Sequence, residues 1–387
     1  MHGNFSRRGI RSIAMRIGSF EFNLRELAGS MGDFGTLLPL AIGYITVCKM
    51  DPAGLLVLMG LANIVTGLVY RLPMPIEPMK VLAIVAIAQA WTPEKVYTSA
   101  LVMGAVWLLM GATGVMTYVA RWTPKSVVRG IQVSLGVLLA IEGVRMISSW
   151  WLLGVIAVVI VLLLRQNRYA PAAVVLVVLG LGIMLARGQW AGVQGLSFRL
   201  PPLTAISPRE IWPVLRDAGL AQIPLTATNA VIATAALIAY YWPERRVSPR
   251  RLSINMGVMN LVLPFFGGMP LCHGAGGLAG QYYFGARTGG TNLIEGLIEI
   301  ALGLFLAGSI AEIFSAFPTA IVGAMMLLVG IEMAKFARDL RWNRELLPAA
   351  ATVAGALAVN MAVGFAAGCA LHYAIFRRPG PTEPAPG

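Results

Sequence analysis

Long apolar blocks separated by short polar loops recur along almost the whole 387-residue chain. Clear examples lie at 55–70, 100–119, 150–164, 170–185 and 299–311. A helix needs roughly 20 mostly apolar residues to cross the hydrocarbon core of a bilayer. The pattern therefore predicts membrane-spanning helices rather than the weakly alternating segments of a membrane β-barrel.

The blocks fall into two runs of seven, about fourteen segments in all. The first run is predicted at 26–47, 53–70, 76–90, 96–119, 126–142, 148–164 and 170–186. The second run is predicted at 218–240, 252–267, 273–285, 292–310, 317–335, 345–359 and 361–376. The expected fold is an all-α polytopic membrane protein.

The polar stretches between and around the runs complete the organisation. The predicted parts are a cytoplasmic N-terminal segment 1–25, a first repeat 26–186, an extracytoplasmic linker 187–217, a second repeat 218–376 and a short cytoplasmic tail 377–387. With both termini in the cytoplasm, the cytoplasmic side holds 22 of the 30 Lys and Arg residues and the outer side holds seven. Positive residues favour the cytoplasmic side, so the bias supports this orientation.

Composition narrows the class of protein further. Hydrophobic residues make up 57% of the chain and charged residues only 12%, whereas a soluble domain carries about a quarter charged residues. The net charge of +13 sits in short loops rather than in one patch, which argues against a nucleic-acid partner. Cys48, Cys272 and Cys369 are too few and too scattered for a metal cluster or a disulfide framework. No cofactor and no metal are expected.

The two runs also resemble each other. Gly60, Asn63 and Pro73 match Gly257, Asn260 and Pro270 at one offset of 197 residues. Seven segments in each copy give the copies opposite orientations in the membrane. The sequence therefore predicts a seven-plus-seven inverted repeat, as in many transporters.

The third segment of each run departs from an ordinary spanning helix. Pro73, Pro75 and Pro78 fall within six residues, which no helix interior accepts. The tenth segment is rich in glycine from Gly267 to Gly280. Segments 3 and 10 are therefore predicted to be broken half-helices, and paired interruptions at corresponding positions are typical of a transporter's binding site.

An anion suits such a site. A helix N-terminus presents free N–H groups and the positive end of the helix dipole. At Gly274, Gly276 and Gly277 the absent side chains let an oxyanion reach the backbone amides. The alternative is that these glycines serve only close helix packing.

Two stretches carry a specific resemblance. The run from Pro75 to Lys80 and the run from Phe266 to Gly289 resemble the two signature motifs of the molybdate transporter family, a branch related to sulfate permeases. Residues 29–36 also resemble the first span of that family, and the likeness covers nearly the whole chain. The family usually has Gln where this chain has Glu77.

The resemblance implies a core domain from segments 1–4 and 8–11 and a gate domain from segments 5–7 and 12–14. It implies a secondary active transporter that imports molybdate by alternating access, with the oxyanion held between facing half-helix N-termini. The alternative is a sulfate or other small-anion permease of the same fold. A channel is disfavoured because pore-lining rings are absent from the pattern, and no motif of an enzyme, such as HExxH or a Walker A loop, is present.

Charged residues within segments are costly and are usually paired or functional. Asp33 and Glu77 are the candidates for coupling transport to a proton, with an internal ion pair as the alternative for Asp33. Lys80 is expected to pair with Asp33 or Glu77, or to add charge to the substrate site. Glu295 and Glu299 are expected to lie near Arg287 and to serve in structural ion pairing.

Four polar residues of other segments complete the candidates. Thr226, Thr228 and Asn229 in segment eight would face the cavity, or else form interhelical contacts, and His273 is expected to be a packed, hydrogen-bonded histidine or a ligand. The predicted substrate-binding residues are Gly32, Asp33, Thr36, Glu77, Pro78, Met79, Lys80, Thr226, Asn229, His273, Gly274, Ala275, Gly276 and Gly277.

The expected partners are a small oxyanion (molybdate, with sulfate as a competitor), a proton as the candidate coupling ion, and membrane lipid. A homodimer is left open. The compact chain favours a bacterial inner membrane as the location.

Overall fold

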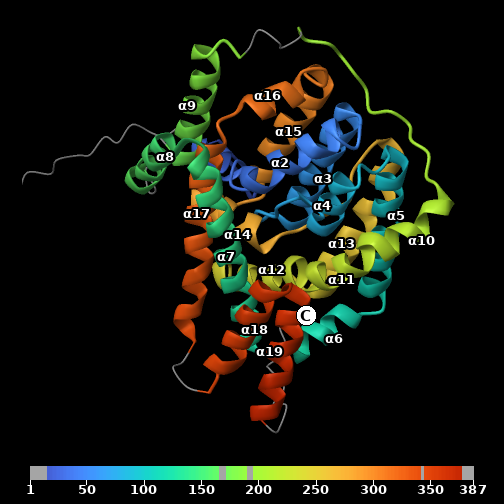
Figure 1. The fold of residues 1–387 in the computed structure, drawn as a ribbon, viewed down its shortest axis with the longest axis vertical. Helices are drawn as coiled ribbons and strands as arrows, with labels where there is room; N and C mark the ends of the chain where they lie inside the picture. The colour runs from blue at the N-terminus through green and yellow to red at the C-terminus, as the bar shows by residue number, and fades with distance from the viewer. Residues whose placement is uncertain (1–14, 165–170, 190–194, 341–343, 377–387) are drawn as a thin grey trace, which may run out of the picture.

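The computed structural model describes residues 15–164, 171–189, 195–340 and 344–376. These residues are mostly helical (Figure 1). Two small antiparallel pairings correct the all-α expectation: the hairpin β1 (Met15–Ile17) with β2 (Phe20–Phe22), and β3 (Glu77–Pro78) with β4 (Leu271–Cys272). The predicted tail 377–387 and residues 1–14 of the predicted N-terminal segment lie outside the described residues.

Each segment of the first predicted run contains a helix. The helices are α1 (Leu24–Gly29), α2 (Phe34–Thr46), α3 (Pro52–Tyr70), α4 (Lys80–Ala88), α5 (Pro93–Ala112), α6 (Val115–Trp122), α7 (Lys125–Ile147), α8 (Trp151–Leu164) and α9 (Ala172–Ala186). Segment one is broken between α1 and α2, where the backbone passes through Gly32 and Asp33. The break places the acidic side chain of Asp33 in the protein interior, and the Asp33 carbonyl accepts from the amide of Leu37 at 3.1 Å as α2 begins.

Segment eight begins earlier than predicted, because the helical run starts at Pro208 instead of residue 218. It comprises η2 (Pro208–Glu210), α10 (Ile211–Val214), η3 (Leu215–Gly219), α11 (Leu220–Leu225), η4 (Thr226–Ala233) and α12 (Thr234–Tyr241). Two of these pieces, η3 and η4, are π-helical. Pro224 inside α11 lacks an amide hydrogen, which favours such a local widening of the helix.

The remaining helices complete the second run. They are α13 (Pro249–Val262), η5 (Leu263–Phe266), α14 (Ala275–Phe284), α15 (Gly290–Phe305), α16 (Ile310–Ala316), α17 (Thr319–Ala334), η6 (Lys335–Asp339), α18 (Leu346–Ala358) and α19 (Met361–Ile375). Proline in the first turn, behind a capping side chain, marks several starts: Asp51 caps α3, Thr92 caps α5 and Ser248 caps α13.

By length and composition, four described helical runs are able to cross a membrane: 52–70, 93–112, 125–164 and 208–241. A fifth is added if α16 and α17, which meet at a bend of 71°, form one span. Segments five and six were predicted as separate helices and correspond to α7 and α8, which a 3-10 turn, η1 (Ser148–Trp150), joins directly. The count of fourteen spans stays a prediction.

Close helix contacts organise the molecule into two groups. In the first, α3 packs on α15 and α5 packs on α13; in the second, α7 packs on α17 and α18 lies against α7 and α19 (Figure 1). Glycines permit the closest approach in the second group, where Gly136 faces Gly330 and Gly143 faces Gly323. A Cβ at any of the four would meet the backbone of the opposite helix.

The outer surface of the helices carries many large apolar side chains. Leu109 on α5, Leu163 on α8 and Val178 on α9 are each more than half exposed. Exposed apolar residues at this density are unusual in a soluble protein. They fit a surface that contacts lipid.

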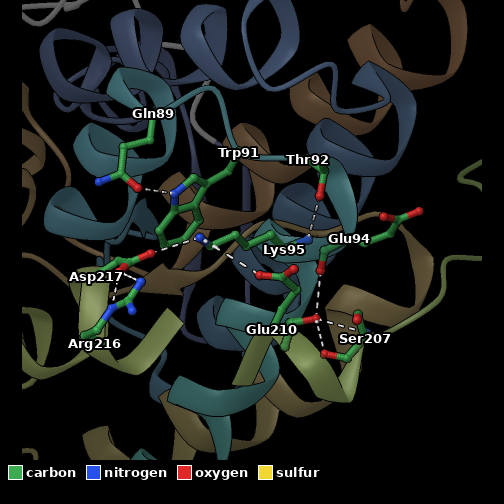
Figure 2. A network of polar contacts seen from close by, with 10 residues as sticks. Gln89, Trp91, Thr92, Glu94, Lys95, Ser207, Glu210, Arg216 and Asp217 are labelled. Atoms are coloured by element: carbon green, nitrogen blue, oxygen red, sulfur yellow. Dashed lines mark hydrogen bonds and ion pairs between the residues drawn. The ribbon is translucent and has the colours of Figure 1, made fainter. Parts of the chain in front are cut away.

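The linker packs on the ends of the helices. Backbone amides of Ser197 and Arg199 donate to the carbonyls of Phe305 and Leu304 at the end of α15. Further along, Lys95 of α5 lies 3.0 Å from Asp217 and 3.9 Å from Glu210, beside the ring of Trp91 (Figure 2). These contacts fix the start of segment eight to the start of α5.

Candidate functional site

The two interrupted segments meet through their extended stretches. Glu77 pairs with Cys272 and Pro78 pairs with Leu271, and the amide of Met79 donates to the carbonyl of Pro270 at 2.9 Å. Prolines keep the first stretch out of the helical conformation. Helix α4 begins two residues after Pro78 and α14 begins three residues after Cys272, so both helix N-termini start at the same crossing.

Asparagine amides satisfy the backbone of both stretches. Asn260 of α13 donates to the carbonyl of Leu271 at 2.6 Å and accepts from its amide at 2.8 Å. Asn292 of α15 makes the same two bonds to Met74, at 2.6 and 2.9 Å. Irregular backbone at membrane depth requires such partners. Leu271 and Met74 are separated by the same 197 residues that relate the two runs.

The N-terminus of α14 is open. Asn229 of η4 accepts from the amide of Ala275 at 3.1 Å, and Gly274 precedes the first turn. The amides of Gly276 and Gly277 donate to no acceptor among the described residues. Two free N–H groups at the positive end of a helix attract negative charge.

A small cavity of about 20 Å³ lies against this helix end, with room for roughly one water molecule. The cavity is lined on one side by Gly32, Asp33, Gly276 and Gly277 and on the other by Leu139, Met325, Met326 and Val329. The second set belongs to α7 and α17. The cavity therefore lies between α14 and the break of segment one on one side and α7 and α17 on the other.

The N-terminus of α4 is closed. The side-chain oxygen of Gln222, on α11, accepts from the amide of Val81 at 2.8 Å and from that of Leu82 at 3.3 Å. Met79, which precedes α4, is fully buried. The amides of Val81 and Leu82 at this helix end therefore have their acceptor within the protein.

Glu77 and Lys80 form the ion pair that was one of the predictions, with 3.2 Å between Lys80 Nζ and a Glu77 oxygen. The Glu77 carboxylate is buried and lies against the glycines of α14. A Cβ at Gly274 or Gly277 would overlap its oxygens. The cradle formed by these glycines is thus occupied by a carboxylate of the chain itself.

Other predicted residues lie around this centre without lining the cavity. Thr226 accepts a hydrogen bond from Gln222 at 2.7 Å. His273 is fully buried, lies 3.1 Å from the Pro75 carbonyl and packs edge-on against Tyr70, so it is a packed histidine. Thr36 belongs to α2, but its side chain lies outside the described residues.

The acidic residues of α15 do not make the expected ion pair with Arg287 within the described chain. Glu295 accepts from Gln281 at 3.1 Å and Glu299 accepts from Asn63 at 2.9 Å. Arg287 instead donates to the carbonyls of Tyr282 and Ala286 and lies over the Tyr282 ring. The side-chain amides of Gln281 and Asn63 take the place expected for the Arg287 guanidinium, because Arg287 lies in the loop after α14.

Sequence reasoning missed several residues of the site. Gln222 carried one signal, a polar side chain in an apolar segment. Leu139, Met325, Met326 and Val329 carried none, because apolar residues in a spanning helix look alike whether they face a cavity or lipid. Among the described residues no group of three or more His, Cys, Asp or Glu side chains is placed to hold a metal ion.

Known sequences share this chain's pattern. A family model described as "Molybdate transporter of MFS superfamily" matches residues 25–139 and 215–333. Molybdate transporter 1 of Arabidopsis thaliana is 31% identical over 412 residues, covering 93% of this chain and 90% of the plant protein. Molybdate transporter 1 of Chlamydomonas reinhardtii is 29% identical over 470 residues, covering 89% of each chain.

Solved structures share the fold. The transmembrane domain of the cyanobacterium bicarbonate transporter BicA is similar with a TM-score of 0.57 and 15% identity, over 89% of this chain and 97% of that one. SLC26A9 is similar with a TM-score of 0.60 and 13% identity, over 91% of this chain and 65% of that one. Because the sequence identities are low, these similarities show a shared fold and nothing about function.

The family model matches more than half of the chain, and the relatives align over nearly its whole length. Those relatives are named as transporters and not as enzymes. The chain is an integral membrane protein with a helical transporter fold, and it belongs to the molybdate transporter family.

Proposed function

We propose that this protein is a secondary active transporter that imports molybdate by alternating access. The observation that carries the proposal is the open N-terminus of α14, where Gly276 and Gly277 line a cavity within the membrane protein. Molybdate is a tetrahedral dianion, which suits backbone amides at the positive end of a helix. Family membership selects molybdate over sulfate, and a sulfate or other small-anion permease is the alternative.

The proposed frame is the inverted repeat of seven plus seven spans. Three features support it. Asn260 and Asn292 clamp backbone positions related by the 197-residue offset. Helix α3 packs on α15 as α5 packs on α13, which exchanges the corresponding members of the two runs. The facing glycines of α7 and α17 recur with the same spacing of seven residues.

The proposed movement is of the core domain (segments 1–4 and 8–11) against the gate domain (segments 5–7 and 12–14). The cavity wall supports this division, because Gly276 and Gly277 belong to the core while Leu139 and Met325 belong to the gate. A five-atom oxyanion needs more room than the one water that about 20 Å³ admits. Binding therefore requires that α7 and α17 draw back from α14.

The remaining site residues receive roles within the same proposal. Lys80 contributes positive charge beside the cradle, and Asn229 orients the first turn of α14 through the Ala275 amide. Glu77 and Asp33 are the acidic residues that couple anion binding to a proton. The protein lies in a bacterial inner membrane with both termini on the cytoplasmic side. A proton gradient drives transport, and the assembly is a homodimer.

Uptake of radiolabelled molybdate into proteoliposomes carrying the purified full chain tests the function. We expect saturable uptake that requires an inward proton gradient, survives excess unlabelled sulfate and is absent from protein-free liposomes. Uptake abolished by sulfate would favour the sulfate-permease alternative. No saturable uptake of either anion under any gradient would refute the proposed function.

A further inference from the structure

A second, larger pocket lies at the C-terminal end of α14. Its volume is about 420 Å³, which gives room for about fourteen water molecules at roughly 30 Å³ each. One wall consists of Arg25 on α1, the last turn of α14 and the loop after it, and the other consists of α8, α9 and α17. The first wall belongs to the proposed core domain and the second to the proposed gate domain. A five-atom oxyanion fits in this pocket without any movement of the helices.

The pocket and the small cavity lie along the same two helices. Helix α14 lines the cavity with its first turn and the pocket with its last turn, and α17 lines the cavity with Val329 and the pocket with Glu332. Gly277 and Gly285 are eight residues apart, which is about 12 Å along a helix axis. In the proposed orientation the loop after segment ten faces the cytoplasm. The pocket therefore lies on the cytoplasmic side of the open end of α14.

Two arginines give the pocket wall its positive charge. Arg25 is exposed and Arg287 is partly buried. Neither guanidinium forms an ion pair with a carboxylate of the described chain. Glu332, the carboxylate of the wall, lies 2.6 Å from the ammonium group of Lys335. A wall with two arginines that lack a carboxylate partner suits a doubly negative ligand.

The guanidinium of Arg287 is held in a fixed orientation. Its Nη1 donates to the carbonyls of Tyr282 and Ala286, both at 2.7 Å. Its central carbon lies 3.7 Å from the centre of the Tyr282 ring, which is stacked on Tyr241. The other guanidinium nitrogens make no hydrogen bond within the described chain. They are therefore available as charged donors, which bind oxyanions strongly.

The backbone keeps Arg25 and Arg287 close together at Gly285. A Cβ at Gly285 would meet the carbonyl oxygen of Arg25 at 2.9 Å, and the φ of +132° at this position suits only glycine. Glu26, next to Arg25, accepts from the amides of Arg287 and Thr288 at 3.1 and 3.0 Å. The buried carboxylate of Glu26 thus binds backbone amides and fixes α1 to the loop that carries Arg287.

We propose that this pocket is a second oxyanion site, which receives the transported dianion after it leaves the N-terminus of α14 for the cytoplasm. The inference rests on the proposed function and adds a binding step that follows release. Arg25 and Arg287 bind the anion through charge-assisted hydrogen bonds. When α17 draws back from α14, the cavity and the pocket join, because both lie along these two helices. The phosphate of a lipid head group has the same chemistry, and the experiment separates the two sources.

Chemical modification read out at single residues tests the site without any transport. Phenylglyoxal modifies accessible arginines, and mass spectrometry of the purified full chain in phosphatidylcholine nanodiscs follows each arginine separately. At ten times its Kd, molybdate should slow the modification of Arg25 about tenfold, because only about one pocket in ten stays empty. Arg246, an exposed arginine before α13 and outside the pocket, is the internal control and should not change. No protection of Arg25, or equal protection of both arginines, would overturn the proposal.

Two variants separate this site from the open end of α14. Gly276→Val covers the amides of α14 and should leave the protection of Arg25 intact. Arg287→Lys keeps the charge but loses the planar fork, so protection should need about tenfold more molybdate. Loss of protection in Gly276→Val would mean that Arg25 only reports occupancy of the first site. Unchanged protection in Arg287→Lys would remove Arg287 from the proposed site.

Phosphatidylglycerol nanodiscs separate a free oxyanion from a lipid phosphate. Without molybdate, we expect Arg25 to react as fast in this anionic lipid as in phosphatidylcholine. If the anionic lipid alone protects Arg25 and molybdate has no effect in phosphatidylcholine, the pocket binds a lipid head group and the proposal fails.

Uptake into proteoliposomes tests whether the site lies on the route of the anion. The side chain of Arg25 makes no hydrogen bond or ion pair with the described chain, so Arg25→Gln should fold normally. We expect its uptake at saturating molybdate to be about threefold slower, and that of Arg246→Gln to be unchanged. Protection of Arg25 with unchanged uptake in Arg25→Gln would contradict a place on the route. If the wild-type chain takes up no molybdate, the proposed function fails, while protection of Arg25 still establishes the pocket as an anion site.

Discussion

The N-termini of α4 and α14 occupy corresponding positions in the two runs, yet the backbone amides of their first turns are hydrogen-bonded differently. At the offset of 197 residues, Gly276 corresponds to Met79 and Gly277 corresponds to Lys80. In α4 the first free amides are bonded to Gln222. In α14 the amides of Gly276 and Gly277 bond to no acceptor of the described protein, and both residues line the cavity.

The difference shows that a helix N-terminus becomes a ligand site only where its donors stay unpaired. Both ends have the same dipole and the same four orphan amides. A buried side chain uses the amides of α4, whereas small residues leave those of α14 accessible. The two helix ends thus have different roles. The segment of α4 holds the Glu77–Lys80 ion pair, and α14 is the proposed anion-binding end.

Filling the open end should have the largest effect. We expect Gly276→Val to weaken molybdate binding about 100-fold, because its side chain covers two charge-assisted hydrogen bonds of about 1.5 kcal/mol each. A Cβ at Gly276 meets only a methyl group of Leu139, at 3.3 Å, so the helix itself tolerates the change. Equilibrium binding of labelled molybdate to the purified protein measures the effect.

Gly182→Val is the control for that variant. Gly182 lies in α9, and a Cβ there meets nothing within 4 Å. The same substitution outside the cavity should leave binding within about threefold of the wild type. Equal losses in the two variants would mean that valine in a spanning helix, and not the covered amides, causes the defect.

The sequence predicted the difference between the N-termini of α4 and α14 only in part. The prolines before Lys80 and the glycines after Gly267 predicted two interrupted segments, since neither composition suits a helix interior. Pairing of Lys80 with Glu77 was one of the two pairings expected, the other being with Asp33, and the structure shows the first. The closure of α4 was not predicted, because it depends on Gln222 reaching across from α11, which no local pattern encodes.

The same limit applies to the fold. Apolar block lengths predicted where helices lie, but not that a 3-10 turn joins α7 directly to α8, or that segment eight begins at Pro208 and contains π-helical turns. Helix continuity is decided by packing around a turn, and hydropathy does not report it. Likewise, Glu295 was expected beside Arg287, and only the tertiary structure placed it beside Gln281.

Removing the charge of Glu77 should have the second largest effect, in the opposite direction. We expect Glu77→Gln to tighten molybdate binding about tenfold, which corresponds to about 1.4 kcal/mol. The carboxylate lies against Gly274 and Gly277 and repels an arriving dianion, and its loss also frees Lys80. Glu94→Gln, at the exposed start of α5, serves as the control and should leave the affinity unchanged. Weaker binding in Glu77→Gln than in the wild type would show that the carboxyl group contacts the anion favourably.

A change at the N-terminus of α4 should have the smallest effect on binding but a measurable effect on stability. Gln222→Ala leaves the amides of Val81 and Leu82 without their acceptor in a buried site, which should cost about 1–2 kcal/mol of folding stability. Affinity for molybdate should change less than threefold, because the open amides belong to α14. Thermal unfolding of the detergent-solubilised protein followed by tryptophan fluorescence gives the first quantity, and a molybdate titration of the same sample gives the second. If affinity instead falls tenfold while the unfolding temperature stays constant, then α4 also binds the anion and the two helix ends are functionally equivalent.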